Sequence, residues 1–142
     1  MQLDTLRESE MGPKLDRSIL FRRCVRDFEV PTGHWTETRK RIDFVAVRGE
    51  TVYTAEMKLT KWREALAQAF TNLFFSNYSY VALWHEAVRN VNRDLFEQSG
   101  IGLLEVNGKC FERIKPRLST MTIPEKHKYL LNYHRKREEQ DD

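Results

Sequence analysis

The sequence predicts an α/β domain in which a mixed central β-sheet is flanked by helices on both faces. Two apolar strands, at 39–47 and 52–59, follow one another across a short turn, which is typical of an antiparallel hairpin. A segment with helical spacing of apolar residues comes next and leads to a third apolar strand at 78–84. Because these strands are apolar on both sides, we expect helices to cover both faces of the sheet.

The first half of the chain is predicted to contain one helix and one short strand before this hairpin. Gly12-Pro13 begins a segment that suits a helix with proline in its first turn, and apolar residues recur at helical spacing as far as Cys24. A short strand is expected at 27–30, where Pro31-Thr32-Gly33 ends it. The hairpin turn itself is Arg48-Gly49-Glu50-Thr51.

The second half is predicted to contain three helices and three strands. Thr60 is suited to cap the first of these helices, whose apolar residues are spaced by three and four. Ser99-Gly100 marks the end of the next helix, and Asn107-Gly108 is a strong turn signal for a second hairpin. The expected helices are 61–75, 86–98 and 124–138, and the expected strands are 78–84, 101–106 and 109–114.

Length and composition indicate one folded domain over 1–137, followed by an acidic tail at 138–142 that we expect to be disordered. The 40% hydrophobic content is well above that of disordered chains, and the net charge of +3 is compatible with a nucleic-acid partner without requiring one. The sequence shows no secretion signal, no membrane-spanning apolar run and no glycine-rich phosphate loop. We therefore expect a cytoplasmic protein with no membrane partner and no nucleotide cofactor.

The hairpin brings charged residues together at one point. If Gly49-Glu50 is a two-residue turn, the antiparallel register places Asp43 directly opposite Glu56. Residues opposite one another point to the same face, with Cβ atoms about 4.5–5.5 Å apart. Lys58 lies two residues after Glu56 and therefore points to that face as well.

Such a pair of carboxylates favours a divalent cation. Two like charges about 5 Å apart repel by roughly 3 kcal/mol at an effective dielectric near 20. Mg²⁺ accepts one or two carboxylates together with phosphate oxygens, so the patch suits metal-assisted attack on a phosphodiester. Lys58 would then orient or activate the water, or stabilise the charge that develops on the phosphate.

The hairpin resembles that of the PD-(D/E)XK nuclease superfamily. Asp43 and the Glu56-Met57-Lys58 triplet match the motif of that superfamily, and Ile42 stands where the motif has proline. The resemblance spans about residues 8–115, and the order of its short motifs gives it specificity. The other matching segments are the first helix at 9–13, the glutamine-bearing helix at 65–69 and the later strands at 80–83 and 100–104.

The resemblance implies a restriction-endonuclease-like fold with a catalytic β-hairpin, and a Mg²⁺- or Mn²⁺-dependent endonuclease that acts on DNA. We expect a homodimer, because enzymes that cut both strands are often dimers. When the family's roles are carried over residue by residue, Lys58 and Gln68 are expected to be catalytic, together with the metal-binding acids Asp43 and Glu56. The expected metal ligands are Asp43, Glu56, the Met57 carbonyl and Glu10, with Glu8 as an alternative to Glu10.

The residues themselves leave other interpretations open. The same fold could serve as a non-catalytic nucleic-acid-binding module or as a structural domain with solvated acids, and Gln68 could be an ordinary polar helix residue. Among the basic groups, Arg39-Lys40-Arg41 is the best candidate for phosphate contact because it leads into the strand that carries Asp43. Arg22-Arg23-Arg26 and Arg135-Lys136-Arg137 are further candidates, although charge runs are usually solvated faces.

Overall fold

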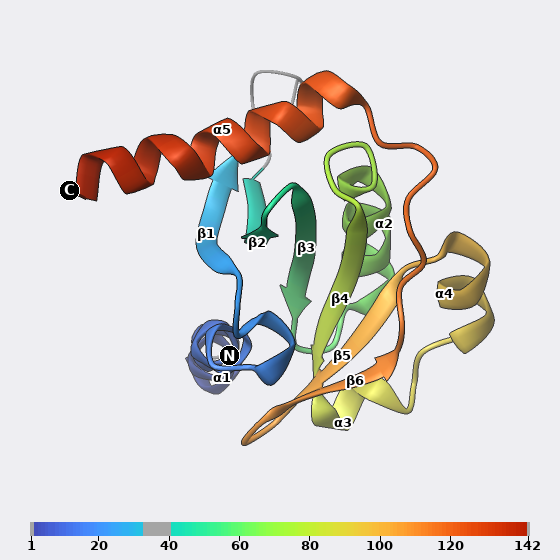
Figure 1. The fold of residues 1–142 in the computed structure, drawn as a ribbon. Helices are drawn as coiled ribbons and strands as arrows, with labels where there is room; N and C mark the ends of the chain where they lie inside the picture. Colours follow the sequence, from blue (N-terminus) through green and yellow to red (C-terminus); the bar gives the residue numbers. More distant parts are fainter. Residues whose placement is uncertain (1, 33–40, 142) are drawn as a thin grey trace.

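The computed structural model describes the backbone of residues 2–32 and 41–141, and the side chains of 9–32, 41–133 and 135. Over these residues the chain forms a six-stranded sheet in which sequence order and spatial order coincide (Figure 1). The pairs β3–β4 and β4–β5 are parallel, and the other three pairs are antiparallel, so the predicted mixed sheet is confirmed. The strands are β1 Val25–Pro31, β2 Arg41–Arg48, β3 Thr51–Lys58, β4 Tyr78–Trp84, β5 Gly102–Val106 and β6 Cys110–Ile114.

Helices cover both faces of this sheet, as the apolar strands predict. On one face, α1 buries Met11 and Leu15 against residues such as Phe44 and Tyr80. On the other face, α2 packs on β3 and β4, and α5 buries Leu130 beside β2 and β3 (Figure 1). The helices are α1 Gln2–Asp16, α2 Trp62–Asn72, α3 His85–Val88, α4 Arg93–Ser99 and α5 Pro124–Asp141, with a short 3-10 turn, η1, at Ile19–Phe21.

The first helix differs from the prediction at both ends. It begins well before Gly12 and contains Pro13 in its interior, and it ends at Asp16 instead of continuing to Cys24. Burial of Met11 and Leu15, four residues apart, favours the earlier start, because packing outweighs the loss of one main-chain hydrogen bond at proline. The chain turns after Asp16 because Ser18 is extended and accepts a hydrogen bond from the Leu20 N–H at 3.2 Å, which caps η1.

Other boundaries also differ from the prediction, and β1, Val25–Pro31, is longer than the strand expected at 27–30. The helix expected at 86–98 is divided into α3 and α4, because the Asn92 side chain accepts a hydrogen bond from the Asp94 N–H at 3.0 Å and so starts a new helix. The helix expected at 61–75 ends earlier, at Asn72. Helix α5 continues to Asp141 and so includes most of the acidic tail for which the sequence predicts disorder. Within the described ranges, no helix is both long and apolar enough to cross a membrane.

Candidate metal and catalytic site

The hairpin between β2 and β3 has the predicted register. Gly49 takes a positive φ of 63° in the two-residue turn, and the paired residues run from Arg48 with Thr51 to Phe44 with Ala55. The next position along this register is Asp43 opposite Glu56. The Asp43 N–H donates to Glu56 Oε2 at 3.3 Å, and the Met57 N–H donates to Asp43 Oδ2 at 2.9 Å. Each acid is therefore held by a main-chain donor of the opposite strand.

Glu56 and Lys58 both project toward α2, since alternate residues of a strand share a face. Asn72, at the end of α2, donates from Nδ2 to Glu56 Oε2 at 2.9 Å. Lys58 Nζ lies 3.3 Å from Glu64 Oε1 in the first turn of α2, and the Lys58 side chain keeps 25% of its surface exposed. The fold thus gathers Asp43, Glu56 and Lys58 where the end of β3 meets α2.

Further polar side chains are buried between α2 and the strands β3 and β4. Thr54 Oγ1 and Ser76 Oγ are 2.9 Å apart, and Ser76 Oγ also donates to the Asn72 carbonyl at 2.9 Å. Ser79 Oγ donates to the Ala69 carbonyl at 2.7 Å, which ties β4 to α2. Glu56 itself is only 1% exposed. Because a buried carboxylate is costly without hydrogen bonds, the Asp43 N–H and Asn72 Nδ2, which both donate to Glu56 Oε2, help Glu56 to occupy this position.

Asn72 is the residue of this site that sequence reasoning missed. It lies three residues after Ala69 and seven after Ala65, so it is a polar residue on the apolar side of α2. That irregularity is a signal the sequence does contain. Gln68, which the resemblance assigns to the site, lies one turn earlier and is half-buried, and the described contact from α2 to Glu56 comes from Asn72.

Of the remaining predicted site residues, Glu10 and Arg41 are exposed and form no described contact with the pair, and the others lie outside the described residues. Glu10 is exposed on α1, the helix that covers the opposite face of the sheet. Arg41 is exposed at the start of β2, and its Nη1 donates to the Glu29 carbonyl at 3.4 Å. The structure does not describe Arg39, Lys40 or the side chain of Glu8.

The strand next to Asp43 is locally distorted. Phe28 pairs with Phe44 and Val30 with Ile42, so Glu29 lies opposite Asp43, yet it makes no regular pair there. Its φ of 51° is in the left-handed region, which is unusual for a residue other than glycine. Such strain clusters at functional sites, and here it interrupts β1 beside the acidic pair.

The donor set at this site fits a hard divalent cation that keeps part of its water shell. Asp43 and Glu56 provide carboxylate oxygens, which Mg²⁺ prefers, and Mg²⁺ needs only one or two of them. Among the described side chains, no three Asp, Glu, His or Cys residues gather closely enough to hold a metal ion. A cation bound by this pair would take further ligands from water or from a phosphate oxygen.

Comparison with known proteins supports the fold and assigns no activity. No protein-family model and no curated protein matches the sequence. The structure is similar to that of a protein of unknown function from Silicibacter pomeroyi, with a TM-score of 0.68 and 13% sequence identity. The match covers 92% of this chain and 85% of that chain. At this identity the likeness shows a shared α/β architecture alone.

Proposed function

We propose that this protein is a Mg²⁺-dependent nuclease, also active with Mn²⁺, that hydrolyses phosphodiester bonds in DNA on a restriction-endonuclease-like fold of the PD-(D/E)XK type. One observation carries the proposal. Asp43 and Glu56 are hydrogen-bonded across the β2–β3 hairpin, and Lys58 follows on the same face. An acidic pair of this kind lowers the stability of the metal-free protein, and a role in binding a cation accounts for its presence.

Each residue of the site has a role that follows from its contacts. Asp43 and Glu56 would hold Mg²⁺, with the Met57 carbonyl as a third ligand, and the bound ion supplies Lewis acidity toward a phosphate oxygen and toward water. Lys58, which is partly exposed, would donate to the phosphate as its negative charge develops. Asn72 is a positioning residue, because it holds Glu56 Oε2 in place.

The strand that carries Asp43 also offers a route for the substrate. Arg41 is exposed at the start of β2, two residues before Asp43. A guanidinium at this position would contact a phosphate neighbouring the one that is cleaved. This contact would position the DNA backbone without reading its sequence.

Cleavage assays with matched variants test this function. Wild-type protein should cut one or more of duplex, branched or single-stranded DNA in Mg²⁺ or Mn²⁺, and EDTA should stop cleavage. Asp43→Ala and Lys58→Ala should each lower the rate by about 10²-fold or more. Lys61→Ala is the matched control, because Lys61 is exposed near Lys58 but lies outside the site, and it should cut at the wild-type rate.

Three outcomes would contradict the proposal or redirect it. Equal cleavage by wild type and the three variants would show a contaminating activity. Absence of cleavage on every DNA substrate, together with DNA binding that EDTA does not change, would favour a non-catalytic nucleic-acid-binding module. Cleavage of RNA alone would keep the metal site and change the substrate. Melting temperatures of all variants confirm that each is folded.

A further inference from the structure

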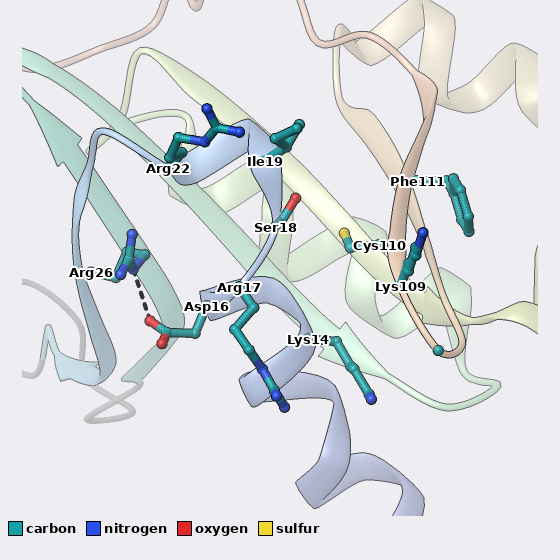
Figure 2. A pocket seen from close by; sticks show the side chains of 11 residues that line it. Lys14, Asp16, Arg17, Ser18, Ile19, Arg22, Arg26, Lys109, Cys110 and Phe111 are labelled. Atoms are coloured by element: carbon teal, nitrogen blue, oxygen red, sulfur yellow. Dashed lines mark hydrogen bonds and ion pairs between the residues drawn. The ribbon is translucent and has the colours of Figure 1, made fainter.

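A second candidate site lies on the α1 face of the sheet, away from Asp43 and Glu56. It is a pocket of about 770 Å³. Figure 2 shows its two walls, one formed by the end of α1 and the segment after it, the other by the turn between β5 and β6. Ser18 and Cys110 approach one another between these walls. Pockets that hold small ligands have volumes of about 300–1,000 Å³, so this one can take more than a bare ion.

Positive charge dominates the pocket. Asp16 is the only acidic residue among the described lining residues, and its Oδ1 accepts from Arg26 Nε at 2.8 Å, so these two charges neutralise each other. Within the described part of the chain, the other cations of the lining form no ion pair. They are Lys14, Arg17, Arg22 and Lys109. Four further cations thus line one pocket of a chain whose net charge is only +3.

Stabilisation of α1 explains only part of this charge. Lys14 and Arg17 lie at the end of α1, where cations interact favourably with the helix dipole. Arg22 and Lys109 lie outside α1, and Lys109 comes from the opposite wall. Like charges that line one pocket from separate segments repel one another, and a bound anion would reduce that repulsion.

The rest of the lining is neutral or apolar. Burial raises the pKa of the Cys110 thiol to about 11, so this thiol carries no negative charge at neutral pH. Phe111 is 38% exposed, with the Arg113 guanidinium 5.0 Å from its ring centroid, and Ile19 on the other wall is 74% exposed. An anion with an aromatic part would meet both the cations and this apolar surface.

We propose that this pocket binds the phosphate groups of a nucleotide, either free or within a single strand, with the base against Phe111. Arginine and lysine form strong charge-assisted hydrogen bonds with phosphate oxygens. An exposed aromatic ring accepts any base by stacking, which gives affinity with little sequence preference. The proposal does not rest on the nuclease function, because its residues belong to the opposite face of the sheet.

Binding measured in EDTA tests the pocket without contribution from a metal at the acidic pair. The probe is a short fluorescent single-stranded oligodeoxynucleotide, whose anisotropy is followed at several salt concentrations. Arg22→Gln combined with Lys109→Gln should weaken binding roughly tenfold at moderate salt and lower the slope of log Kd against log salt by about 1.4. Arg89→Gln combined with Lys128→Gln is the matched control, since both residues are exposed outside the lining, and it should bind like wild type.

Competitors identify the ligand chemistry. Displacement of the probe by adenosine monophosphate assigns the pocket to a free nucleotide, whereas displacement by unlabelled oligonucleotide alone assigns it to a strand; both support the proposal. Phe111→Ala should weaken binding of either nucleotide ligand and leave competition by inorganic phosphate unchanged. The proposal is overturned if wild type binds no nucleotide, if both double variants lose affinity equally, if Phe111→Ala has no effect, or if polyglutamate competes as well as the oligonucleotide.

Discussion

Beside β3, the two faces of the sheet bury different kinds of side chain. On the α1 face, apolar and aromatic residues interlock around Phe21 and Phe44, whose ring centroids are 5.0 Å apart. The α2 face also has apolar clusters, but beside β3 a set of polar side chains is buried as well. They are Thr54, Glu56, Asn72, Ser76 and Ser79, each no more than 2% exposed.

This difference separates what stabilises the domain from what serves its site. Burial of apolar area on the α1 face contributes directly to the free energy of unfolding. A buried carboxylate beside another acid makes a metal-free protein less stable than a well-packed apolar filling would. The polar set on the α2 face is therefore best explained by the chemistry proposed for Asp43 and Glu56.

The largest expected effect is on the apolar face. Phe44 is fully buried and packs against Phe21 and Phe28, so Phe44→Ala should lower the free energy of unfolding by about 3–5 kcal/mol through lost burial and a cavity. Urea denaturation measures the change. If Phe44→Ala lowers the free energy of unfolding no more than substitutions of the buried polar residues on the α2 face do, the contrast between the two faces is wrong.

Asn72→Ala tests the polar face. It removes the Nδ2 donor from buried Glu56, so the free energy of unfolding should fall by about 1–3 kcal/mol. Asn90→Ala is the matched control, because Asn90 is exposed and its side chain lies outside the polar set, and it should have little effect. If the two variants are equally stable in urea denaturation, the hydrogen bond to Glu56 contributes nothing.

Two substitutions at Glu56 should change stability in opposite directions. Glu56→Gln keeps an oxygen that can accept from Asn72 and from the Asp43 N–H, and it removes a charge beside Asp43, so metal-free stability should rise by roughly 1 kcal/mol. Glu56→Ala leaves both donors without this acceptor and should lower stability. Melting temperatures in EDTA measure both changes. A Glu56→Gln protein less stable than wild type in EDTA would argue against repulsion in the pair.

The smallest expected effect is a pH dependence on the apolar face. Burial and the hydrogen bond from Tyr80 to Glu112, at 2.7 Å, raise the pKa of Tyr80 well above its ordinary value near 10. The fold favours the neutral phenol, so its contribution is complete below about pH 10 and is lost as the pH rises further. Tyr80→Phe should cost about 1 kcal/mol near pH 8 and less near pH 11. A constant difference between the two urea midpoints across this range would contradict it.

The hairpin was predictable because local chemistry fixes it. Gly49 permits the two-residue turn, and the apolar pattern of both strands leaves one register, which determines that Asp43 faces Glu56. Strand 78–84 was predicted at its exact bounds because it is a continuous apolar run. For these elements the information lies within a few neighbouring residues.

The extent of α1 and the contact of Asn72 depend on tertiary packing. Pro13 indicates a helix start by local rules, but the burial of Met11 and Leu15 places it inside the helix. Asn72 reaches Glu56 only because of the position at which α2 packs along β3. The spacing of apolar residues does not specify that position. The basic pocket likewise joins Arg22 and Lys109, which are far apart in sequence.

The most direct test of the central claim is a crystal structure of the protein soaked in Mn²⁺, with the ion located by its anomalous scattering. We expect a peak between the carboxylates of Asp43 and Glu56, and its loss in crystals of Glu56→Gln. A saturating soak that leaves these carboxylates without a peak, or that places the ion elsewhere with the pair unchanged, would contradict the claim that this hairpin is a metal-dependent nuclease site.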